Sequence, residues 1–137
     1  MNQERSPKSE IKLDDTVGWI YLWGSGKDGR LGNGSEKSER VPKKIDYTKF
    51  RQVSCGYHHN AAIDLNGKIY TWGKGSNGQL GTGSLESEYF PIYIAIPGNI
   101  PIAQVVCGWQ HTMALSQDGQ IYSWVMIFKL INKLRII

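Results

Sequence analysis

The sequence of 137 residues contains only two cysteines, three methionines and three phenylalanines, and only 20% of its residues are charged. Long apolar runs are also missing. Uncharged apolar runs such as residues 121–128 are far shorter than the roughly 20 residues that a membrane-spanning helix needs. The first 13 residues are charged and polar where a secretory signal would be apolar, so we expect a cytoplasmic or nuclear protein without a membrane span. In that setting both cysteines are expected to stay reduced.

Glycine, by contrast, is abundant, with 16 residues in the chain. Together with a hydrophobic share of 40%, this favours a turn-rich globular protein and argues against long helices or general disorder. The net charge of +4 is concentrated in residues 27–51 and 125–137. A solvated loop is the favoured interpretation of the first segment, because acidic residues are mixed into it, and a nucleic-acid or chromatin surface is the weaker alternative. The basic residues that come closest to such a surface are Lys37, Arg40, Lys43, Lys44, Lys49 and Arg51.

An internal repeat is the dominant signal. Residues 20–42 and 69–91 are identical at 13 of 23 positions, at an offset of 49. Residues 53–72 and 105–124 are identical at 9 of 20 positions, at an offset of 52. A period near 50 residues with short apolar runs and regular glycines is typical of a β-propeller built from four-stranded antiparallel blades. The sequence therefore predicts an all-β protein.

Short strands and tight turns are expected within each repeat. The dipeptides Asn66-Gly67 and Asp118-Gly119 tolerate positive φ at both central positions, so they predict two-residue primed turns between paired strands. The strands are predicted at residues 50–55, 59–65 and 68–72, and again at residues 102–107, 111–116 and 120–124.

Two prolines at the repeat period, Pro42 and Pro91, lack an amide donor and are expected to begin outer, edge strands. Between each closing tryptophan and its proline the chain must cross to the next blade. The glycines of residues 24–34 and 73–83 allow that path, because glycine reaches backbone angles closed to other residues.

These motifs resemble the repeats of the regulator of chromosome condensation (RCC1) family. The similarity covers residues 20–124 and is carried by Cys-Gly, His, Asp-Gly and Ile-Tyr-x-Trp in one part of the repeat and by Trp-Gly and Gly-Gln-Leu-Gly in the other. The matching signature positions are Trp23, Gly24, Gly29, Leu31, Gly32, Gly34, Cys55, Gly56, His59, Gly67, Trp72, Gly73, Gly78, Leu80, Gly81, Gly83, Cys107, Gly108, His111, Gly119 and Trp124.

The resemblance implies a seven-bladed propeller, of which this chain supplies about two blades. It places one repeat at residues 20–68, a second at 69–120 and the start of a third at 121–124. An incomplete propeller leaves apolar flanks, so we expect a fragment of a longer protein, or a chain that needs a partner to cover them. The implied function is a protein-binding scaffold. The alternative is guanine nucleotide exchange on a Ran-type small GTPase, with chromatin association.

Enzymatic and metal sites are weaker interpretations of the same residues. Residues 24–29 and 73–78 have the glycine spacing of a dinucleotide-binding loop, but no helix can begin there, so structural turns are expected. Cys55, His59, Cys107 and His111 could supply zinc ligands, yet they recur as equivalent positions of two blades, where the histidine can hold a backbone group. We therefore expect no catalytic, cofactor-binding or metal site.

Aromatic residues have two expected roles. Trp23, Trp72 and Trp124 share one register and are expected to pack between blades. The segment around Trp109, Gly-Trp-Gln-His-Thr, is similar to Gly-Trp-Arg-His-Thr segments of plant ultraviolet-B receptors in the same superfamily. Glutamine replaces the arginine here, so light sensing is not expected.

The two ends differ from the repeats. Residues 1–16 are predicted to be a disordered leader, whereas residues 17–23 are predicted to be ordered. The repeat pattern stops at Val125, where the other repeats have Gly24 and Gly73. We expect residues 125–137 to be either translated non-coding sequence, since valine codons begin with the bases of an intron start, or a basic amphipathic tail that caps the exposed flank.

Overall fold

The computed structural model describes residues 17–125, and within that range the chain is all β apart from two single-turn 3₁₀ helices. Residues 1–16 and 126–137, on which the predictions of a leader and of most of the tail rest, lie outside the described residues. The strands are β1 (Tyr21–Gly24), β2 (Glu39–Lys44), β3 (Phe50–Cys55), β4 (His59–Asp64), β5 (Ile69–Gly73), β6 (Glu88–Ile94), β7 (Ile102–Cys107), β8 (Thr112–Ser116) and β9 (Ile121–Trp124); the 3₁₀ turns are η2 (Lys27–Gly29) and η3 (Pro97–Asn99).

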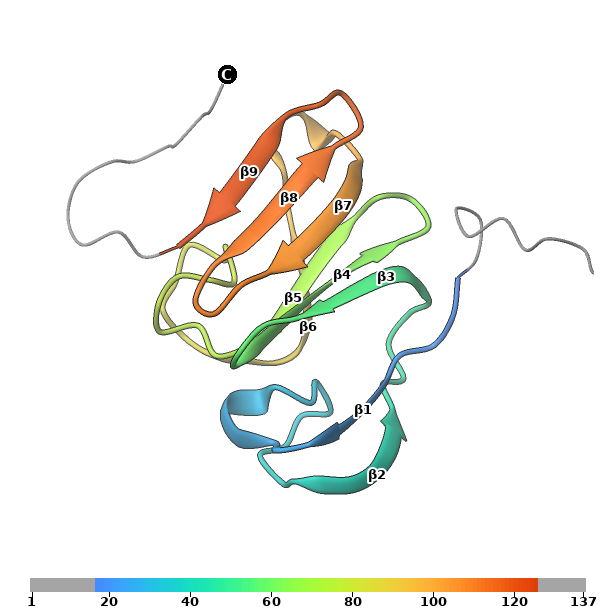
Figure 1. Cartoon of the computed structure of the whole chain (residues 1–137), viewed down its shortest axis with the longest axis vertical. Helices are drawn as coiled ribbons and strands as arrows, with labels where there is room; N and C mark the ends of the chain where they lie inside the picture. The colour runs from blue at the N-terminus through green and yellow to red at the C-terminus, as the bar shows by residue number, and fades with distance from the viewer. Residues whose placement is uncertain (1–16, 126–137) are drawn as a thin grey trace, which may run out of the picture.

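Three antiparallel sheets follow one another along the chain. Their strand orders are β1-β2, β3-β4-β5-β6 and β7-β8-β9. We call them the first unit, the middle blade and the last unit. The sheets are stacked face to face in chain order, with the first unit at the bottom of Figure 1 and the last unit at the top. By the repeat, β1 and β2 correspond to β5 and β6, so the first unit is the outer half of a blade.

The registers show how the repeat builds each blade. β4 pairs with β5 through Asn60 opposite Trp72, and β8 pairs with β9 through Thr112 opposite Trp124. The register then shifts between β5 and β6 at Gly73, and between β1 and β2 at Gly24. Both glycines have φ near +100°, which explains the shift. This conformation kinks β5 before β6 pairs with it, and likewise kinks β1 before β2 pairs with it.

The tight turns after β4 and β8 differ from the predicted two-residue primed turns. Gly67 and Gly119 have positive φ, but Asn66 and Asp118 do not. In the first turn the amide of Gly67 donates to the carbonyl of Asp64, and the amide of Asp64 donates to the carbonyl of Lys68. This is a three-residue turn that ends in a left-handed glycine, which also suits the twist of a hairpin.

The prolines also sit differently from the prediction. Pro42 and Pro91 lie inside β2 and β6 rather than at their first residues. Both strands are the outer edges of their sheets, as expected, and an edge position tolerates a residue without an amide donor because only one side of the strand is paired.

The hydrophobic core consists of two layers between the sheets. Between the first unit and the middle blade lie Ile20, Ile45, Phe50, Ala62 and Trp72. Between the middle blade and the last unit lie Ala61, Ile63, Ile69, Ile94, Ile96, Ile102, Val105 and Ala114, with Tyr122 and Trp124 packed against them. Successive strand residues point to opposite faces, so neighbouring residues such as Ala61 and Ala62 serve different layers.

Candidate interaction surface

One rim of the stacked sheets collects most of the long loops. The loops that leave β1 and β5, residues 25–38 and 74–87, lie on the same side as the β3–β4 and β7–β8 turns, at the lower left of Figure 1. The opposite rim carries the β4–β5 and β8–β9 turns. The repeat thus brings equivalent turns of two blades, residues 56–58 and 108–110, to the same rim.

An exposed aromatic pair marks these turns. The rings of Tyr57 and Trp109 stack with their centroids 4.4 Å apart and their planes 24° apart. Both side chains are more than half exposed, at 54% and 64%. The ring of His58 meets Tyr57 edge-on, with a centroid distance of 4.1 Å. Large exposed aromatic surface of this kind is enriched where proteins bind partners.

The charge of this surface depends on His58. Burial lowers the pKa of His58, and the nearby cations Arg30 and Lys74 lower it further. The lowered pKa favours the neutral imidazole of His58 at pH 7, beside Lys74 and beside Arg30, whose guanidinium pairs with Asp28 at 3.0 Å. We call Tyr57, His58 and Trp109 the aromatic patch.

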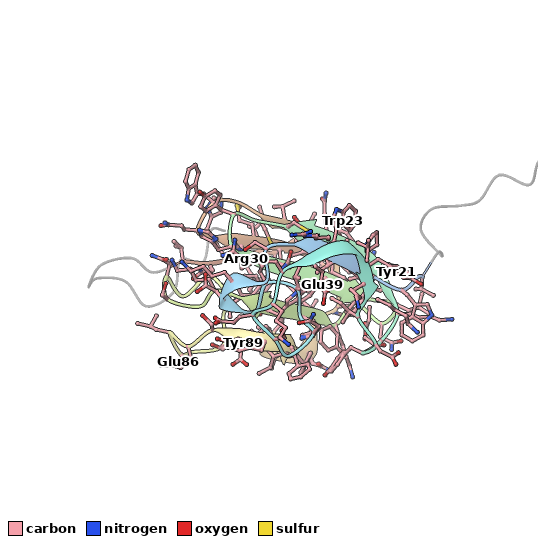
Figure 2. The ribbon with its side chains drawn as sticks, turned by 90° about the horizontal axis from the view of Figure 1, so that it is seen from below. Tyr21, Trp23, Arg30, Glu39, Glu86 and Tyr89 are labelled. Atoms are coloured by element: carbon pink, nitrogen blue, oxygen red, sulfur yellow. The ribbon has the colours of Figure 1, made fainter. Side chains whose placement is uncertain are left out.

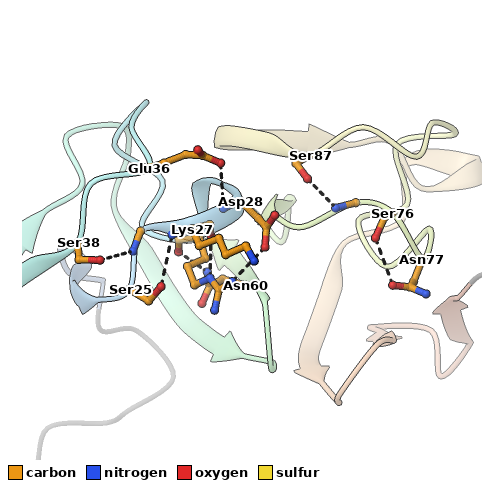
Figure 3. A network of polar contacts seen from close by, with 12 residues as sticks. Ser25, Lys27, Asp28, Glu36, Ser38, Asn60, Ser76, Asn77 and Ser87 are labelled. Atoms are coloured by element: carbon orange, nitrogen blue, oxygen red, sulfur yellow. Dashed lines mark hydrogen bonds and ion pairs between the residues drawn. The ribbon is translucent and has the colours of Figure 1, made fainter.

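The glycine-rich loops beside the patch are held by short-range polar contacts, drawn in Figure 3. The Ser38 hydroxyl accepts from the amide of Gly26 at 3.4 Å, and the Ser87 hydroxyl accepts from the amide of Gly75 at 3.3 Å. These two contacts occupy the same place in consecutive repeats. The loops are therefore structural turns closed by a serine, and apart from the single 3₁₀ turn η2 they carry no helix that could face a phosphate.

The first loop also contacts the middle blade. The side-chain amide of Asn60 donates to the carbonyl of Arg30 at 2.6 Å. The Tyr89 hydroxyl, on β6, donates to the Glu36 carboxylate at 3.1 Å. Figure 2 shows Arg30 and Tyr89 on the side of the molecule where the first unit lies. The loop of one repeat is thereby fixed against the next.

Two signature glycines are required by close approach. A Cβ at Gly32 would lie 2.8 Å from Nε1 of Trp72, and a Cβ at Gly81 would collide with the ring of Trp124. Each glycine therefore provides a flat shelf for the tryptophan of the following repeat. Trp72 is fully buried and Trp124 half-buried, which confirms their packing between sheets.

Trp23 does not pack as predicted. Its side chain is 60% exposed, although its register matches that of Trp72. The reason is that no sheet or glycine shelf precedes it among residues 17–125. The strand position of Trp23 is equivalent to that of Trp72 in the repeat, but the burial of the side chain depends on whether a neighbouring sheet covers it.

A polar chain links the middle blade to the last unit. Nε2 of His59 lies 2.9 Å from the hydroxyl of Thr112, and this hydroxyl donates to the carbonyl of Gln79 at 2.7 Å. Since the hydroxyl has one proton, Nε2 of His59 must be the donor to it. His59 thus holds the Thr112 side chain of the last unit, and burial lowers its pKa to about 4, although a hydrogen bond with the backbone of His111 opposes this shift.

Further hydrogen bonds tie β3 to β7. Gln52 exchanges hydrogen bonds with the backbone of Val105 in both directions, at 2.8 and 3.1 Å. The Ser54 hydroxyl accepts from the amide of Cys107 at 2.9 Å. The guanidinium of Arg51 donates to the carbonyl of Ile102 at 2.5 Å.

Cys55 and Cys107 are both free thiols. Burial raises the pKa of Cys107 to about 11 and also raises that of Cys55, so neither thiol ionises at neutral pH. His111 is exposed, whereas His59 is engaged with Thr112. Over residues 17–125, no three His, Cys, Asp or Glu side chains gather in a way that could hold a metal ion.

The basic residues of the first repeat are partly neutralised. Lys43 lies 3.9 Å from Glu39, and Lys44 lies 3.3 Å from Asp46. The ammonium of Lys44 also sits over the ring of Trp19 at 3.8 Å. These contacts neutralise part of the positive charge of Lys43 and Lys44 in solvated pairs, which contribute little to stability.

The remaining signature positions occupy turns and strand ends. Gly29, Gly34, Gly78 and Gly83 lie in the two long loops with positive φ, Leu31 and Leu80 are buried within them, and Gly56 and Gly108 begin the two rim turns.

Sequence reasoning overlooked Tyr57 as part of the rim. Its signal was available, because Tyr57 aligns with Trp109 at the repeat offset of 52 and both are aromatic. It also overlooked Gln52 and Ser54, whose role depends on the distance between two blades. Nothing local in the sequence marks such residues.

Comparison with known proteins identifies the repeat. The family model described as "Regulator of chromosome condensation (RCC1) repeat" matches residues 18–63 and 66–115, and a second model of the same description matches residues 50–79. No helix in the described part of the chain is long and apolar enough to cross a membrane.

Relatives and solved structures agree with this match. The chain is 39% identical over 110 residues to the ultraviolet-B receptor UVR8 of Arabidopsis thaliana, covering 78% of this chain and 25% of the receptor. It is 35% identical over 112 residues to the human E3 ubiquitin-protein ligase HERC2, covering 78% of this chain and 2% of the ligase. The chain thus spans a quarter or less of these two relatives.

Structures of two proteins have the same fold. Human WBSCR16 superposes with a TM-score of 0.73 at 23% identity, over 85% of this chain and 32% of that one. Prp20p of Saccharomyces cerevisiae, studied with its binding to Gsp1p and histones, superposes with a TM-score of 0.71 at 23% identity, over 82% of this chain and 30% of that one. The described sheets therefore form part of an incomplete RCC1-type propeller.

Proposed function

Because the chain belongs to the RCC1 repeat family, we propose that it is a protein-binding module whose contact surface is the rim carrying Tyr57, His58 and Trp109. The observation that carries this proposal is the stacked, exposed pair of Tyr57 and Trp109 on equivalent turns of two blades. Rigid sheets hold these turns, so the aromatic rings are presented without a large loss of conformational entropy on binding.

The chemistry of the patch indicates the kind of partner. The lowered pKa of His58 favours its neutral form at pH 7, and Arg30 and Lys74 lie near it. An apolar or aromatic side chain of a protein partner would cover the rings, and an acidic group beside it would meet Lys74, because Arg30 is already paired with Asp28 at 3.0 Å. No nucleophile, base or cofactor is required for such a role.

The test uses the chain as bait in cells, with partners quantified by mass spectrometry. The double variant Tyr57→Ser/Trp109→Ser removes the stacked rings. Leu65→Ser is the matched control, because Leu65 is 58% exposed on the opposite rim. We expect the double variant to lose a specific set of proteins that the control retains. Equal capture by all three would contradict the proposed surface.

A second candidate function is guanine nucleotide exchange on a Ran-type small GTPase, with chromatin association. It is favoured by the similarity of the fold to Prp20p, which was studied for binding to Gsp1p and histones. Nucleotide release requires a shaped surface rather than a catalytic triad. The test measures release of a fluorescent guanine nucleotide from a Ran-type GTPase by the complete gene product. Release at the unassisted rate would exclude this candidate.

A further inference from the structure

The outer edges of the first unit and of the middle blade differ in chemistry. β2 and β6 occupy equivalent places in the repeat, and each lies at the end of its sheet. At the repeat offset of 49, three basic residues of β2 are replaced by apolar ones in β6: Arg40 by Tyr89, Lys43 by Ile92 and Lys44 by Tyr93. The fold accepts charge at these positions, so it does not by itself require apolar side chains there.

Four large apolar side chains of β6 reach the surface. Tyr89, Phe90, Ile92 and Tyr93 are 36%, 59%, 37% and 40% exposed, and we call them the β6 strip. Single exposed apolar residues are common, but several along one strand are typical of a binding surface. Sheets are present on both sides of the middle blade, so this exposure does not arise at an end of the described chain.

Contacts beneath the strip hold its rings in place. The Tyr93 ring lies 5.9 Å from the ring of Tyr70, and its hydroxyl donates to the side-chain oxygen of Asn99 at 3.4 Å. The Phe90 ring lies so close to Gly34 that a Cβ there would collide with it. Because these rings are already positioned, a partner that covers them loses little conformational entropy in ordering them.

The backbone of β6 is less available than its side chains. The carbonyl of Tyr89 already accepts from the amide of Gly34 at 2.9 Å, and Pro91 has no amide to donate. Both features discourage the addition of another strand to this edge. A partner is therefore expected to recognise the side chains of the strip rather than to extend the sheet.

The charges at one end of the strip are acidic. Glu36 accepts from the Tyr89 hydroxyl at 3.1 Å, and Glu88 precedes Tyr89 on β6. Figure 2 labels Glu86 and Tyr89 at the same edge of the molecule. None of these three carboxylates forms an ion pair within residues 17–125. This end therefore attracts a cation, which the faces of the aromatic rings also favour.

A cavity adjoins the other end of the strip. It has a volume of about 190 Å³, and its lining includes Tyr93, Lys68 and the buried residues Ile69, Ile94 and Ile96. The β6–β7 loop, where the repeat offset grows from 49 to 52, supplies another wall. An apolar cavity of roughly 150 Å³ holds a benzene ring, so this one has room for a large apolar side chain. The ammonium of Lys68, 5.7 Å from the centre of the Tyr93 ring, opposes a second cation here.

We propose that the β6 strip and this cavity bind an extended segment of another protein, at a surface separate from the aromatic patch. The segment lays apolar side chains on the strip, inserts one large apolar side chain into the cavity, and brings a lysine or arginine to the acidic end. From Tyr89 to Tyr93 the strand spans roughly 13 Å, at about 3.3 Å per residue. The basic residue and the inserted side chain are therefore about four residues apart in the bound segment.

The first experiment selects ligands by their chemistry. A library of short random peptides displayed on phage is enriched on the immobilised full chain, and the recovered peptides are sequenced. We expect them to share a lysine or arginine and a large apolar residue about four positions apart. Recovery of no shared pattern, or of a pattern without a basic residue, would overturn the proposal.

The decisive variant uses side chains that the fold already accepts. Tyr89→Arg/Ile92→Lys gives β6 the residues that β2 carries at the equivalent positions. Fluorescence anisotropy with a labelled peptide from the selection measures the affinity. We expect a loss of more than about tenfold, as at interface hot spots, because apolar contact is lost and cations meet a basic peptide. Undiminished binding would refute the β6 strip as the site.

A milder variant keeps the test decisive if the charged one does not fold. Circular dichroism checks the fold of each variant. Tyr89→Ser/Ile92→Thr removes the apolar surface without adding charge, and it should also weaken binding by about tenfold. Binding as tight as that of the natural chain would again refute the site.

Two further variants separate the charge from the location. Glu36→Gln keeps an acceptor for the Tyr89 hydroxyl but removes the charge, so it should weaken binding about threefold and reduce its sensitivity to salt. An unchanged affinity would contradict the cation site at this end. Trp109→Ser alters the aromatic patch and not the strip, so it should bind the peptide normally. If it abolishes binding, the peptides occupy the aromatic patch, and this proposal fails while the proposed function stands.

Sedimentation tests a second copy of the chain as the occupant of the strip. The natural chain and Tyr89→Arg/Ile92→Lys are compared at the same concentrations, and both are expected to have the same average mass. A natural chain that dimerises while the variant stays monomeric would show that a second copy covers the strip, which would overturn the proposal of a different partner.

Discussion

Trp23 and Trp72 end equivalent strands in the first unit and the middle blade, yet one side chain is 60% exposed and the other fully buried. The same contrast separates Ile121 from Ile69 and His111 from His59. The residue types are identical and the backbone positions equivalent. What differs is the neighbouring sheet: within residues 17–125, the middle blade is covered on both faces and each outer unit on one face only. In a repeat fold, a residue's energetic role is therefore decided by its neighbour as much as by its own strand.

The largest expected effect comes from the two tryptophans. Trp72→Ala removes a fully buried ring that packs on Phe50 and Gly32, so it should lower the free energy of unfolding by about 3–5 kcal/mol. Trp23→Ala removes an exposed ring and should change it by less than about 0.5 kcal/mol in dilute monomer. Urea titrations of both variants measure the difference. Similar losses in the two would break the comparison, since they would mean that Trp23 is covered in solution.

The histidines provide a pH test of the same contrast. Burial lowers the pKa of His59 from its ordinary 6.5 to about 4, so the unfolded chain binds a proton more readily than the folded one between these values. The contribution of neutral His59 to the free energy of unfolding is therefore fully present above pH 6.5. It is lost as the pH drops, by about 3 kcal/mol at pH 4. Urea titrations of the natural chain at pH 7, 5.5 and 4 should show the loss.

The control for this pH effect is His59→Gln, which keeps a donor for Thr112 but does not titrate. The variant should lose much of the slope of stability between pH 6.5 and 4. His111→Gln, at the exposed equivalent position, should keep the natural slope. If the two variants behave alike, the acid sensitivity does not arise from the buried contact between the middle blade and the last unit.

A smaller effect is expected at the glycine shelves. Gly32 and Gly83 both have positive φ, but a Cβ at Gly32 meets the Trp72 ring, while a Cβ at Gly83 has open space around it. Gly83→Ala should destabilise by about 1 kcal/mol through backbone strain alone. Gly32→Ala should lower the free energy of unfolding by about 1–2 kcal/mol more than Gly83→Ala does, because the tryptophan or the loop must shift. Equal losses in the two variants would contradict the close contact between Gly32 and the Trp72 ring.

How far the sequence predicted this structure depends on the range of the interactions. The strands β3 and β7 begin and end at the predicted residues, 50–55 and 102–107, since the alternation of side chains and the glycine that follows each strand are local signals. The hairpin turns were misassigned because Asn66 tolerates both turn types, and the Asp64 carboxylate, which accepts from the amides of Asn66 and Lys68, selects the longer one. That choice depends on a side chain outside the dipeptide.

The interaction surface was less predictable than the fold. The repeat alignment placed Trp109 and Tyr57 in equivalent turns, but their stacking depends on how far one blade is rotated from the next. The burial of Trp72 and the exposure of Trp23 likewise depend on which sheets are present. Sequence periodicity specifies each blade, whereas contacts between blades arise from residues about 50 positions apart whose pairing no local pattern records.

The smallest expected effect concerns the last unit. Val125 occupies the register of Gly24 and Gly73, whose φ near +100° precedes a shifted pairing with the fourth strand. Val125 itself does not have a positive φ, and β9 has no partner strand on its outer side within residues 17–125. Val125→Gly should therefore change the free energy of unfolding by less than about 1 kcal/mol, mainly through the flexibility of glycine in the unfolded chain. A gain above 1 kcal/mol in urea titrations would contradict this, because it would mean that a fourth strand pairs with β9 once glycine permits the kink.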